Sequence, residues 1–206
     1  NVMSGQSSND DIYLFIMRHG EAEAPRLDDK SRQLTPLGRE QAKTAALWLK
    51  DQYCQKGIVD LALVSPYRRA KQTHDMVSLD IIANKVENNE DIVPEGSPRL
   101  VSDYIDGLLH AAVNSKKPIK KLLVVSHMPL VSYLVDELCQ SYTTSLFSTA
   151  SIAVIKYSLK EHKGTLVTHY QGLTVKQIEE IRSEMRKSGI LFKITKNRIT
   201  KLALEG

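Results

Sequence analysis

The sequence predicts an α/β protein: a three-layer sandwich in which helices cover both faces of a mostly parallel sheet. Three runs are continuously apolar, as buried parallel strands are: Ile12–Met17, Leu61–Val64 and Leu122–Val125. Each run is followed by a helix-start signal that contains proline, whose missing N–H would be unpaired in the first turn anyway. Strands that alternate with helices in this way are typical of layered α/β domains.

The helices expected after these strands open at three proline-containing pairs, which are Thr35-Pro36, Ser65-Pro66 and Met128-Pro129. A further helix is expected over Ser102–Val113 and a fourth strand over Ser151–Tyr157. The stretch from Asn84 to Pro98 is polar and rich in turn residues, so we expect it to be a loop.

Length and composition indicate one full-sized domain with an appendage. The chain has 206 residues, of which 42% are hydrophobic, enough for a real core. We expect a flexible tail over residues 1–11, the α/β domain over 12–163 and a basic appendage over 164–206. No apolar stretch approaches the ~20 residues of a membrane helix. The two distant cysteines, Cys54 and Cys139, favour a reducing compartment, so the expected location is cytoplasmic, without membrane contact.

Three polar clusters stand at the carboxyl ends of the predicted strands. The first strand ends in Arg18-His19-Gly20, the second runs into Ser65-Pro66-Tyr67-Arg68-Arg69, and the third ends in Ser126-His127. In an open α/β sheet the carboxyl ends of parallel strands face one crevice. Two histidines and at least two arginines are therefore expected to converge on one pocket.

This set of side chains suits a phosphoryl group. Arginine offers fork-shaped donors that match phosphate oxygens, helix N-termini add N–H donors, and a neutral imidazole is a competent nucleophile. One histidine would attack, while the other histidine and the arginines would hold the oxygens on which charge develops. The cationic side chains would supply the positive charge, so no cofactor or metal is expected. Gly20 is expected to let the backbone turn beside the nucleophile.

Four stretches, "FIMRHGEAE", "LTPLGREQA", "LVSPYRRAKQT" and "LVVSHMPLV", resemble the histidine phosphatase (phosphoglycerate-mutase-like) superfamily over about residues 12–157. They are most similar to its small bacterial branch, the protein phosphohistidine phosphatases. The resemblance implies that His19 is the nucleophile and becomes phosphorylated, that Arg18 and Arg69 bind the phosphoryl group, and that His127 completes the pocket. It favours Arg69 over the adjacent Arg68, because Arg69 fits the pattern SP-x-x-R-A-x-Q-T.

The general acid is expected in the loop after the second helix, where larger family members carry a carboxylic acid. Glu90 occupies the comparable region, with Asp91 and Glu95 as neighbours. A strong acid matters less for phosphohistidine than for an alkyl phosphate, because the leaving imidazole can already be protonated.

The favoured substrate is phosphohistidine on a signalling protein, such as a histidine phosphotransfer domain. Mutases and sugar phosphatases of the superfamily carry extra helices over the pocket, whereas here only the Tyr67–Lys121 interval is available. Two alternatives remain open. One is a small-metabolite phosphomonoesterase or mutase; the other is a non-catalytic module that binds phosphate or RNA through the C-terminal segment.

The last segment has a different character. "VTHYQGLTV" and "FKITKNRITKLAL", within about residues 165–206, resemble a fragment of the N-terminal domain of the bacterial ribosomal stalk-base protein. The segment predicts strand, helix, strand and helix, with the first helix ending at Gly189, a strand over 190–195 and the last helix from Asn197. Its eight basic and four acidic residues account for the formal net charge of +4. RNA contact is the alternative; we favour Gly164–Thr168 as the last strand of the sheet, with the rest packed beside it.

Overall fold

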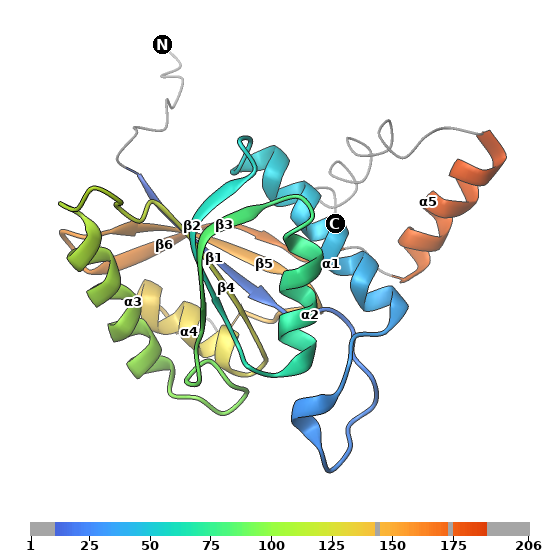
Figure 1. The fold of residues 1–206 in the computed structure, drawn as a ribbon, viewed down its shortest axis with the longest axis horizontal. Coiled ribbons are helices and arrows are strands. Elements are labelled where there is room, and N and C mark those ends of the chain that lie inside the picture. Colours follow the sequence, from blue (N-terminus) through green and yellow to red (C-terminus); the bar gives the residue numbers. More distant parts are fainter. Residues whose placement is uncertain (1–10, 143–144, 173–174, 189–206) are drawn as a thin grey trace.

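The computed structural model describes residues 11–142, 145–172 and 175–188. Six strands form one sheet in the order β3-β2-β4-β1-β5-β6 (Figure 1). The strands are β1 (Ile12–Arg18), β2 (Ile58–Val64), β3 (Ile82–Asn88), β4 (Lys121–Ser126), β5 (Ile152–Ser158) and β6 (Lys163–Tyr170). The helices are α1 (Pro36–Gln52), α2 (Arg68–Val77), α3 (Pro98–Ala112), α4 (Leu130–Cys139) and α5 (Val175–Ser188), with a short 3₁₀ turn at Asp29–Ser31.

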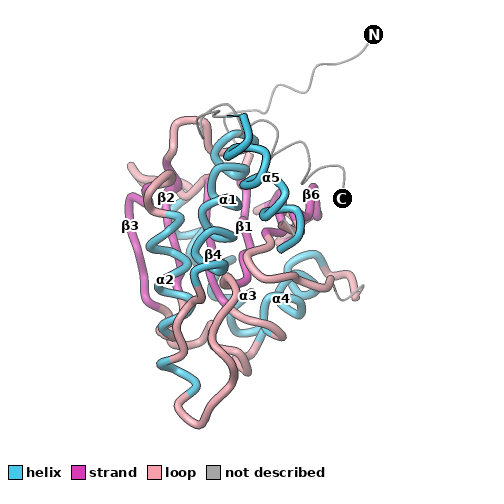
Figure 2. The backbone as a smooth tube through the Cα atoms, turned by 90° about the vertical axis from the view of Figure 1, so that its right-hand side faces the viewer, coloured by secondary structure: helices cyan, strands magenta, loops and turns pink. Residues whose placement is uncertain are grey.

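Helices cover both faces of the sheet, which confirms the predicted layered α/β fold. Side chains alternate across β1, so that Leu14 and Ile16 join the core under α3 and α4. Phe15 and Met17 join the core under α1 and α2, where Trp48 is fully buried. Figure 1 shows the two helix pairs on opposite sides of the sheet, and Figure 2 looks onto α1 and α2.

The four strands β3, β2, β4 and β1 are parallel, while β5 and β6 are antiparallel to their neighbours. The last residues of the central strands are in register, since Val125 of β4 lies beside both Met17 of β1 and Val64 of β2. Residues that follow these positions are therefore delivered to the same edge of the sheet. The expected convergence of the strand ends is a direct consequence of this register.

The helix starts agree with the expected places to within a few residues. Pro36 is the first residue of α1, and the Thr35 hydroxyl caps the helix by accepting from the N–H of Gly38 at 3.0 Å. The second helix begins at Arg68 rather than at Pro66, and α4 begins at Leu130, just after a cis Met128–Pro129 peptide bond. The helix expected over Ser102–Val113 is α3, which begins earlier, at Pro98.

The prediction of a loop over residues 84–98 is wrong for residues 84–88, because β3 extends to Asn88. This strand lies at the edge of the sheet and pairs only with β2. Most of its side chains are exposed, so it has neither the continuous apolar run of a central strand nor a clean alternation. The pattern that identified the buried strands therefore could not find it.

The start of the C-terminal segment belongs to the sheet. Strand β6 crosses the expected boundary between residues 163 and 164 and pairs with β5 from Lys163 to Tyr170, with one register shift opposite Val154 and Ile155. Helix α5 follows and lies near α1 in Figure 2, where Arg182 of α5 forms an ion pair with Glu40 of α1. The expected strand over 190–195, the expected last helix and most of the expected N-terminal tail lie outside the described residues. Within the described part of the chain, no helix is long and apolar enough to cross a membrane.

Candidate active site

Strand β1 delivers Arg18 and His19 to the carboxyl edge of the sheet. The backbone N–H of Arg18 donates to the carbonyl of Ser151, and that of His19 donates to the carbonyl of Ser126, at 3.1 and 3.0 Å. His19 is thereby held directly beside the end of β4, next to His127. The centroids of the two imidazole rings are 5.1 Å apart.

The His19 ring is oriented by its own chain. Its Nδ1 lies 2.7 Å from the carbonyl oxygen of Gly20. Because a carbonyl only accepts, Nδ1 must carry the proton of the neutral ring, which leaves the lone pair on Nε2. The lone pair accepts from Nε–H of Arg69 at 3.3 Å. Nε2 is therefore the atom available for attack.

Burial keeps His19 neutral. The side chain is 7% exposed. Its pKa is lowered to about 3, mainly by burial and further by the charges of Arg69, Arg18 and Arg32. The hydrogen bond to Gly20 acts in the opposite direction and raises the pKa. At neutral pH the ring is consequently neutral, with a free lone pair on Nε2, as a nucleophile requires.

Arg69 enters the site from the first turn of α2 and is only 3% exposed. Thr73, one turn further along α2, donates to the carbonyl of Arg69 at 2.7 Å and accepts from the N–H of Gly20 at 3.0 Å. The start of α2 is thus tied to the loop that carries His19. The adjacent Arg68 is exposed, whereas Arg69 is buried in the site.

His127 follows β4 and is 1% exposed. Its Nε2 lies 2.7 Å from the hydroxyl of Ser65, and this hydroxyl also accepts from the N–H of Tyr67 at 3.3 Å. The direction of this bond follows the tautomer of His127: with the ring proton on Nδ1, Nε2 accepts the Ser65 proton. Burial, followed by the neighbouring His19 and Arg69, lowers the pKa of His127 to about 2.

Two polar atoms of the site are buried without a hydrogen-bond partner in the described part of the chain: Nε of Arg18 and Nδ1 of His127. Nε of Arg18 is a donor, as is Nδ1 of His127 when it carries the ring proton, and buried donors without a partner suit an anionic ligand. One end of the Arg18 guanidinium is fixed, since NH1 donates to the carbonyl of Phe147 at 2.8 Å.

Asp29 and Arg32 belong to the same cluster and were not predicted. Asp29 receives Arg69 through its carbonyl at 2.7 Å and its carboxylate at 3.1 Å, and its carboxylate also binds Arg32 at 2.9 Å. The charge of Arg32 reaches both histidines, since it lowers the pKa of His19 and of His127. The only sequence signal was an acidic and basic run in a loop, which is more often a solvated surface.

Glu90 is the one predicted site residue that the structure does not join to the others. Its side chain is exposed, and it makes no hydrogen bond or ion pair with a described residue. Its loop is held at the carboxyl edge of the sheet, because the Ser126 hydroxyl donates to the carbonyl of Ile92 at 2.8 Å. Glu90 therefore lies in a loop at the carboxyl edge of the sheet, outside the buried cluster.

The expected reason for Gly20 is wrong. The positive-φ glycines among the described residues are Gly57 and Gly172, so Gly20 does not need a left-handed turn. A Cβ at Gly20 would instead lie 2.4 Å from the carbonyl oxygen of Gly38, at the start of α1. The glycine is required for the close approach of the two backbones.

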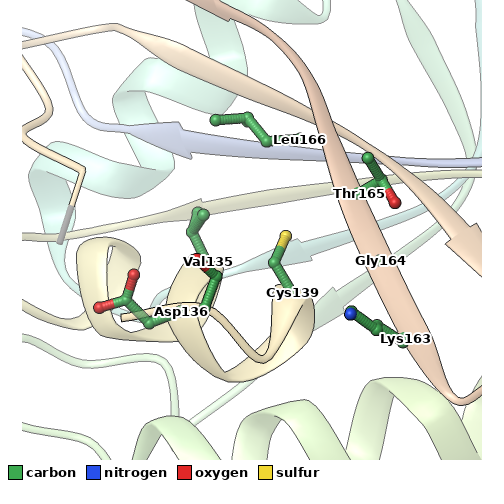
Figure 3. A pocket seen from close by; sticks show the side chains of 8 residues that line it. Val135, Asp136, Cys139, Lys163, Gly164, Thr165 and Leu166 are labelled. Atoms are coloured by element: carbon green, nitrogen blue, oxygen red, sulfur yellow. The ribbon is translucent and has the colours of Figure 1, made fainter. Parts of the chain in front are cut away.

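The hollow of about 260 Å³ between α4 and β6 is a separate feature (Figure 3). It is lined by side chains such as Asp136 and Cys139 of α4 and Lys163 of β6, and by none of the site residues.

Comparison with known proteins assigns the family. The model of the histidine phosphatase superfamily (branch 1) matches residues 14–91. The phosphohistidine phosphatase SixA of Escherichia coli (strain K12) is 38% identical over 145 residues, which cover 70% of this chain and 84% of that protein. The chain therefore belongs to the histidine phosphatase superfamily, as a phosphatase of the group that SixA represents.

A solved structure supports the same assignment. The protein histidine phosphatase SixA in complex with tungstate matches with a TM-score of 0.68 and 34% identity, over 77% of this chain and 96% of that chain.

The C-terminal resemblance is also confirmed. The ribosomal protein L10 model matches residues 149–206, so the similarity begins earlier than residue 165 and includes β5. The large ribosomal subunit protein uL10 of Pelagibacter ubique is 52% identical over 54 residues, which are 26% of this chain and 32% of that protein.

Proposed function

We propose that this protein removes the phosphoryl group from phosphohistidine on a signalling protein, with phospho-His19 as the intermediate. The observation that carries this proposal is the state of His19. Its proton is held on Nδ1 by the Gly20 carbonyl, its pKa is far below neutrality, and its Nε2 faces the guanidinium of Arg69. A neutral, oriented imidazole among cations suits attack on an anionic phosphoryl group.

The proposed reaction has two steps. First, Nε2 of His19 bonds to phosphorus as the bond from phosphorus to the substrate imidazole breaks; a substrate imidazole protonated on its other nitrogen then leaves as a neutral ring. Second, water attacks the phosphoryl group on His19 and inorganic phosphate leaves. Arg18 and Arg69 hold the equatorial oxygens in both steps.

The proposed role of His127 is to donate to the phosphoryl oxygens. In this role the Ser65 hydroxyl donates to Nε2, and Nδ1, which has no partner among the described residues, carries the ring proton. A buried donor fixed before the reaction stabilises the charge that develops in the transition state. The charges of Arg18, Arg69 and Arg32 offset those of the phosphoryl group, so the proposed chemistry is metal-independent.

Glu90 is the proposed general acid. The Ser126–Ile92 hydrogen bond brings its loop to the site edge, and an exposed carboxylic acid there could meet the leaving group of a bound substrate. For phosphohistidine the demand on this acid is small.

A protein substrate is favoured over a small metabolite. The Tyr67–Lys121 interval, which the structure describes in full, is used by α2, β3, α3 and their connections, and it contains no further helix to enclose the site. The relatives are named phosphohistidine phosphatases, and one binds tungstate, a tetrahedral oxyanion like phosphate. We further propose a cytoplasmic location, which the free thiols of Cys54 and Cys139 support.

RNA contact by the C-terminal segment stays the alternative function. We also keep the proposed division into a phosphatase domain over residues 12–163 and an appendage of other origin over 164–206. The match to ribosomal protein L10 supports that origin, whereas the Arg182–Glu40 ion pair supports packing on the phosphatase. RNA binding by the full chain that falls steeply with salt, and that Arg186→Gln with Lys187→Gln weakens, would favour RNA contact.

The test of the proposed activity is rapid-quench labelling with a ³²P-phosphohistidine phosphotransfer domain and, in parallel, a phosphate monoester. We expect an acid-labile label on the wild-type chain that turns over, and no label on His19→Ala. The matched control is His74→Ala, which removes a half-buried histidine of α2 outside the site and should label normally. Faster turnover of the monoester would favour the small-metabolite alternative, and no label or phosphate release from either substrate would refute the mechanism.

A further inference from the structure

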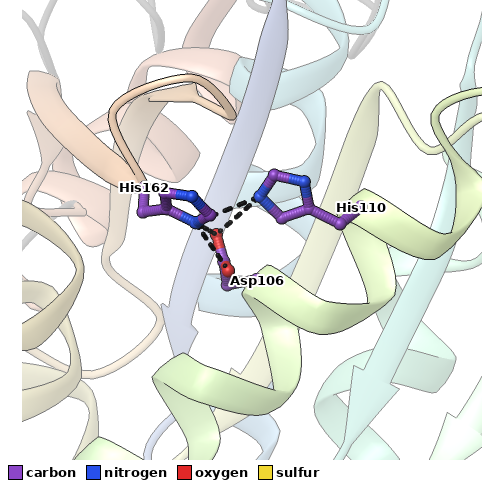
Figure 4. Close-up of side chains that lie close together, drawn as sticks. All are labelled: Asp106, His110 and His162. Carbon is purple, nitrogen blue, oxygen red and sulfur yellow. Dashed lines mark hydrogen bonds and ion pairs between the residues drawn. The ribbon is translucent and has the colours of Figure 1, made fainter.

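Three side chains with metal-binding groups meet on the surface between α3 and the turn that joins β5 to β6 (Figure 4). Asp106 and His110 are one turn apart on α3, so they project from the same face of the helix. His162 lies in the turn, with a φ of 50°. We call these three residues the α3–turn cluster.

The ligand atoms of the α3–turn cluster are spaced like those of a metal site. Nε2 of His110 lies 3.1 Å from Nδ1 of His162 and 3.4 Å from Oδ1 of Asp106. Nδ1 of His162 lies 3.0 Å from Oδ2 of Asp106. Zinc binds such atoms at about 2.0–2.2 Å, and neighbouring corners of that tetrahedron are about 3.3 Å apart. The three contacts therefore have the lengths of tetrahedron edges.

With an ionised carboxylate, no placement of the ring protons gives each of the three close contacts a hydrogen of its own. If both ring nitrogens carry protons, two N–H groups face each other across 3.1 Å. If only His162 Nδ1 carries one, the lone pair of His110 Nε2 faces the carboxylate oxygen across 3.4 Å. If only His110 carries one, the lone pair of His162 faces the carboxylate at 3.0 Å. A cation between the three groups would be attracted to all of them.

The carboxylate is also held in place. The hydroxyl of Tyr157 donates to Oδ1 of Asp106 at 2.7 Å, and Tyr157 is 6% exposed. Hydrogen bonds of this kind orient metal-binding carboxylates and tune their affinity. The two histidines remain partly exposed, with 39% and 61% of their side-chain surface accessible, so an ion and a water molecule can reach the cluster.

The α3–turn cluster is remote from the phosphatase site. Tyr157, near the last residue of β5, pairs with Ile12 at the start of β1. Ile152, the first residue of β5, pairs with Met17 near the active site. The turn after β5 therefore lies at the opposite edge of the sheet. An ion there would tie α3 to the β5–β6 hairpin without touching the reacting groups.

We propose that Asp106, His110 and His162 bind a zinc ion, with water in the fourth position. Two imidazoles and a carboxylate form a donor set that zinc accepts readily, with a fourth position left for water. The ion has a structural role: it joins an element of the phosphatase domain to the hairpin from which the C-terminal segment continues. The proposal does not depend on the proposed substrate.

The first test is titration of the metal-free full chain with zinc chloride, followed by calorimetry and by thermal unfolding. We expect a single zinc ion per chain at this cluster and a rise in Tm that a chelator reverses. His110→Ala, His162→Ala and Asp106→Asn should each weaken binding by at least about tenfold, and Tyr157→Phe by about tenfold. The His74→Ala variant is the matched control and should bind like wild type.

Two further measurements keep the result specific. Because His19 and His127 also face each other, the titration is repeated in a His127→Ala background, where the α3–turn cluster should still bind zinc. Cobalt replaces zinc in a parallel titration, and intense visible absorption reports four-coordinate geometry. Absence of zinc binding in the wild type, equal binding by all the cluster variants despite native circular dichroism, or a six-coordinate cobalt spectrum would each overturn the proposal.

Discussion

Asp29 holds Arg69 through two hydrogen bonds: its backbone carbonyl accepts at 2.7 Å and its carboxylate at 3.1 Å. The same carboxylate binds Arg32 at 2.9 Å. A loop that follows β1 thus sets the orientation of the arginine that meets His19. This loop also places a negative charge beside the proposed phosphoryl-binding site.

Asp29 variants should separate orientation from charge. Asp29→Asn keeps an acceptor and removes a charge, so we expect inorganic phosphate to inhibit about two- to fivefold more strongly at low salt. Asp29→Ala also removes the acceptor and should lower kcat by about tenfold, because Arg69 and Arg32 lose their orientation. Steady-state kinetics with phosphate as inhibitor checks both. Wild-type values in the two variants would show that the ion pairs have no part in catalysis.

Glu90→Gln should distinguish substrates by their leaving groups. Hydrolysis of an alkyl phosphate should fall by about a hundredfold, since the alkoxide needs a proton, whereas phosphohistidine hydrolysis should stay within about threefold of wild type. Glu95→Gln is the matched control, an exposed glutamate in the same loop. An unchanged rate with both substrates would remove Glu90 from the mechanism, and an equal fall with both would indicate a positioning role.

The stability of the protein should fall as pH is lowered from about 6.5 towards 3. Burial lowers the pKa of His19 to about 3 and of His127 to about 2, so in this window the unfolded chain binds protons that the folded chain does not. Each group adds a slope of up to about 1.4 kcal/mol per pH unit, with stability rising with pH.

Urea unfolding of wild type and His127→Gln across this pH range measures the effect. The variant should have the shallower pH dependence, whatever its stability at neutral pH. Parallel curves for the two proteins would mean that His127 is protonated in the folded state as readily as in the unfolded one.

Gly20→Ala should destabilise the fold by about 1–3 kcal/mol or more and lower kcat, because the new Cβ would meet the Gly38 carbonyl at 2.4 Å. The matched control is Gly107→Ala in α3, where a Cβ has nothing within 4 Å. There the helix should gain about 0.5–1 kcal/mol. Chemical denaturation and activity assays report both. A neutral Gly20→Ala variant would show that α1 can move away from the loop.

Much of the fold could be predicted because its central strands are covered on both faces. Such strands must be continuously apolar, and the polar residues that interrupt them mark the carboxyl edge where chemistry takes place. Strand β3 was missed because an edge strand with exposed side chains is under neither constraint. The described part of the C-terminal segment was anticipated from a resemblance, and Gly164–Thr168 was expected as the last strand of the sheet, where β6 lies.

The amino-acid sequence alone was sufficient for the layered fold, the superfamily and the convergence of Arg18, His19, Arg69 and His127, because these follow from local apolar patterns and strand order. Only the tertiary structure decided which histidine nitrogen is free, how Asp29 and Arg32 join the site, and why position 20 is glycine. It also brought His162 to Asp106 and His110. The physical reason is the same in each case: hydrogen bonds, burial and close backbone contacts join residues far apart in the chain, and no local pattern encodes these distances.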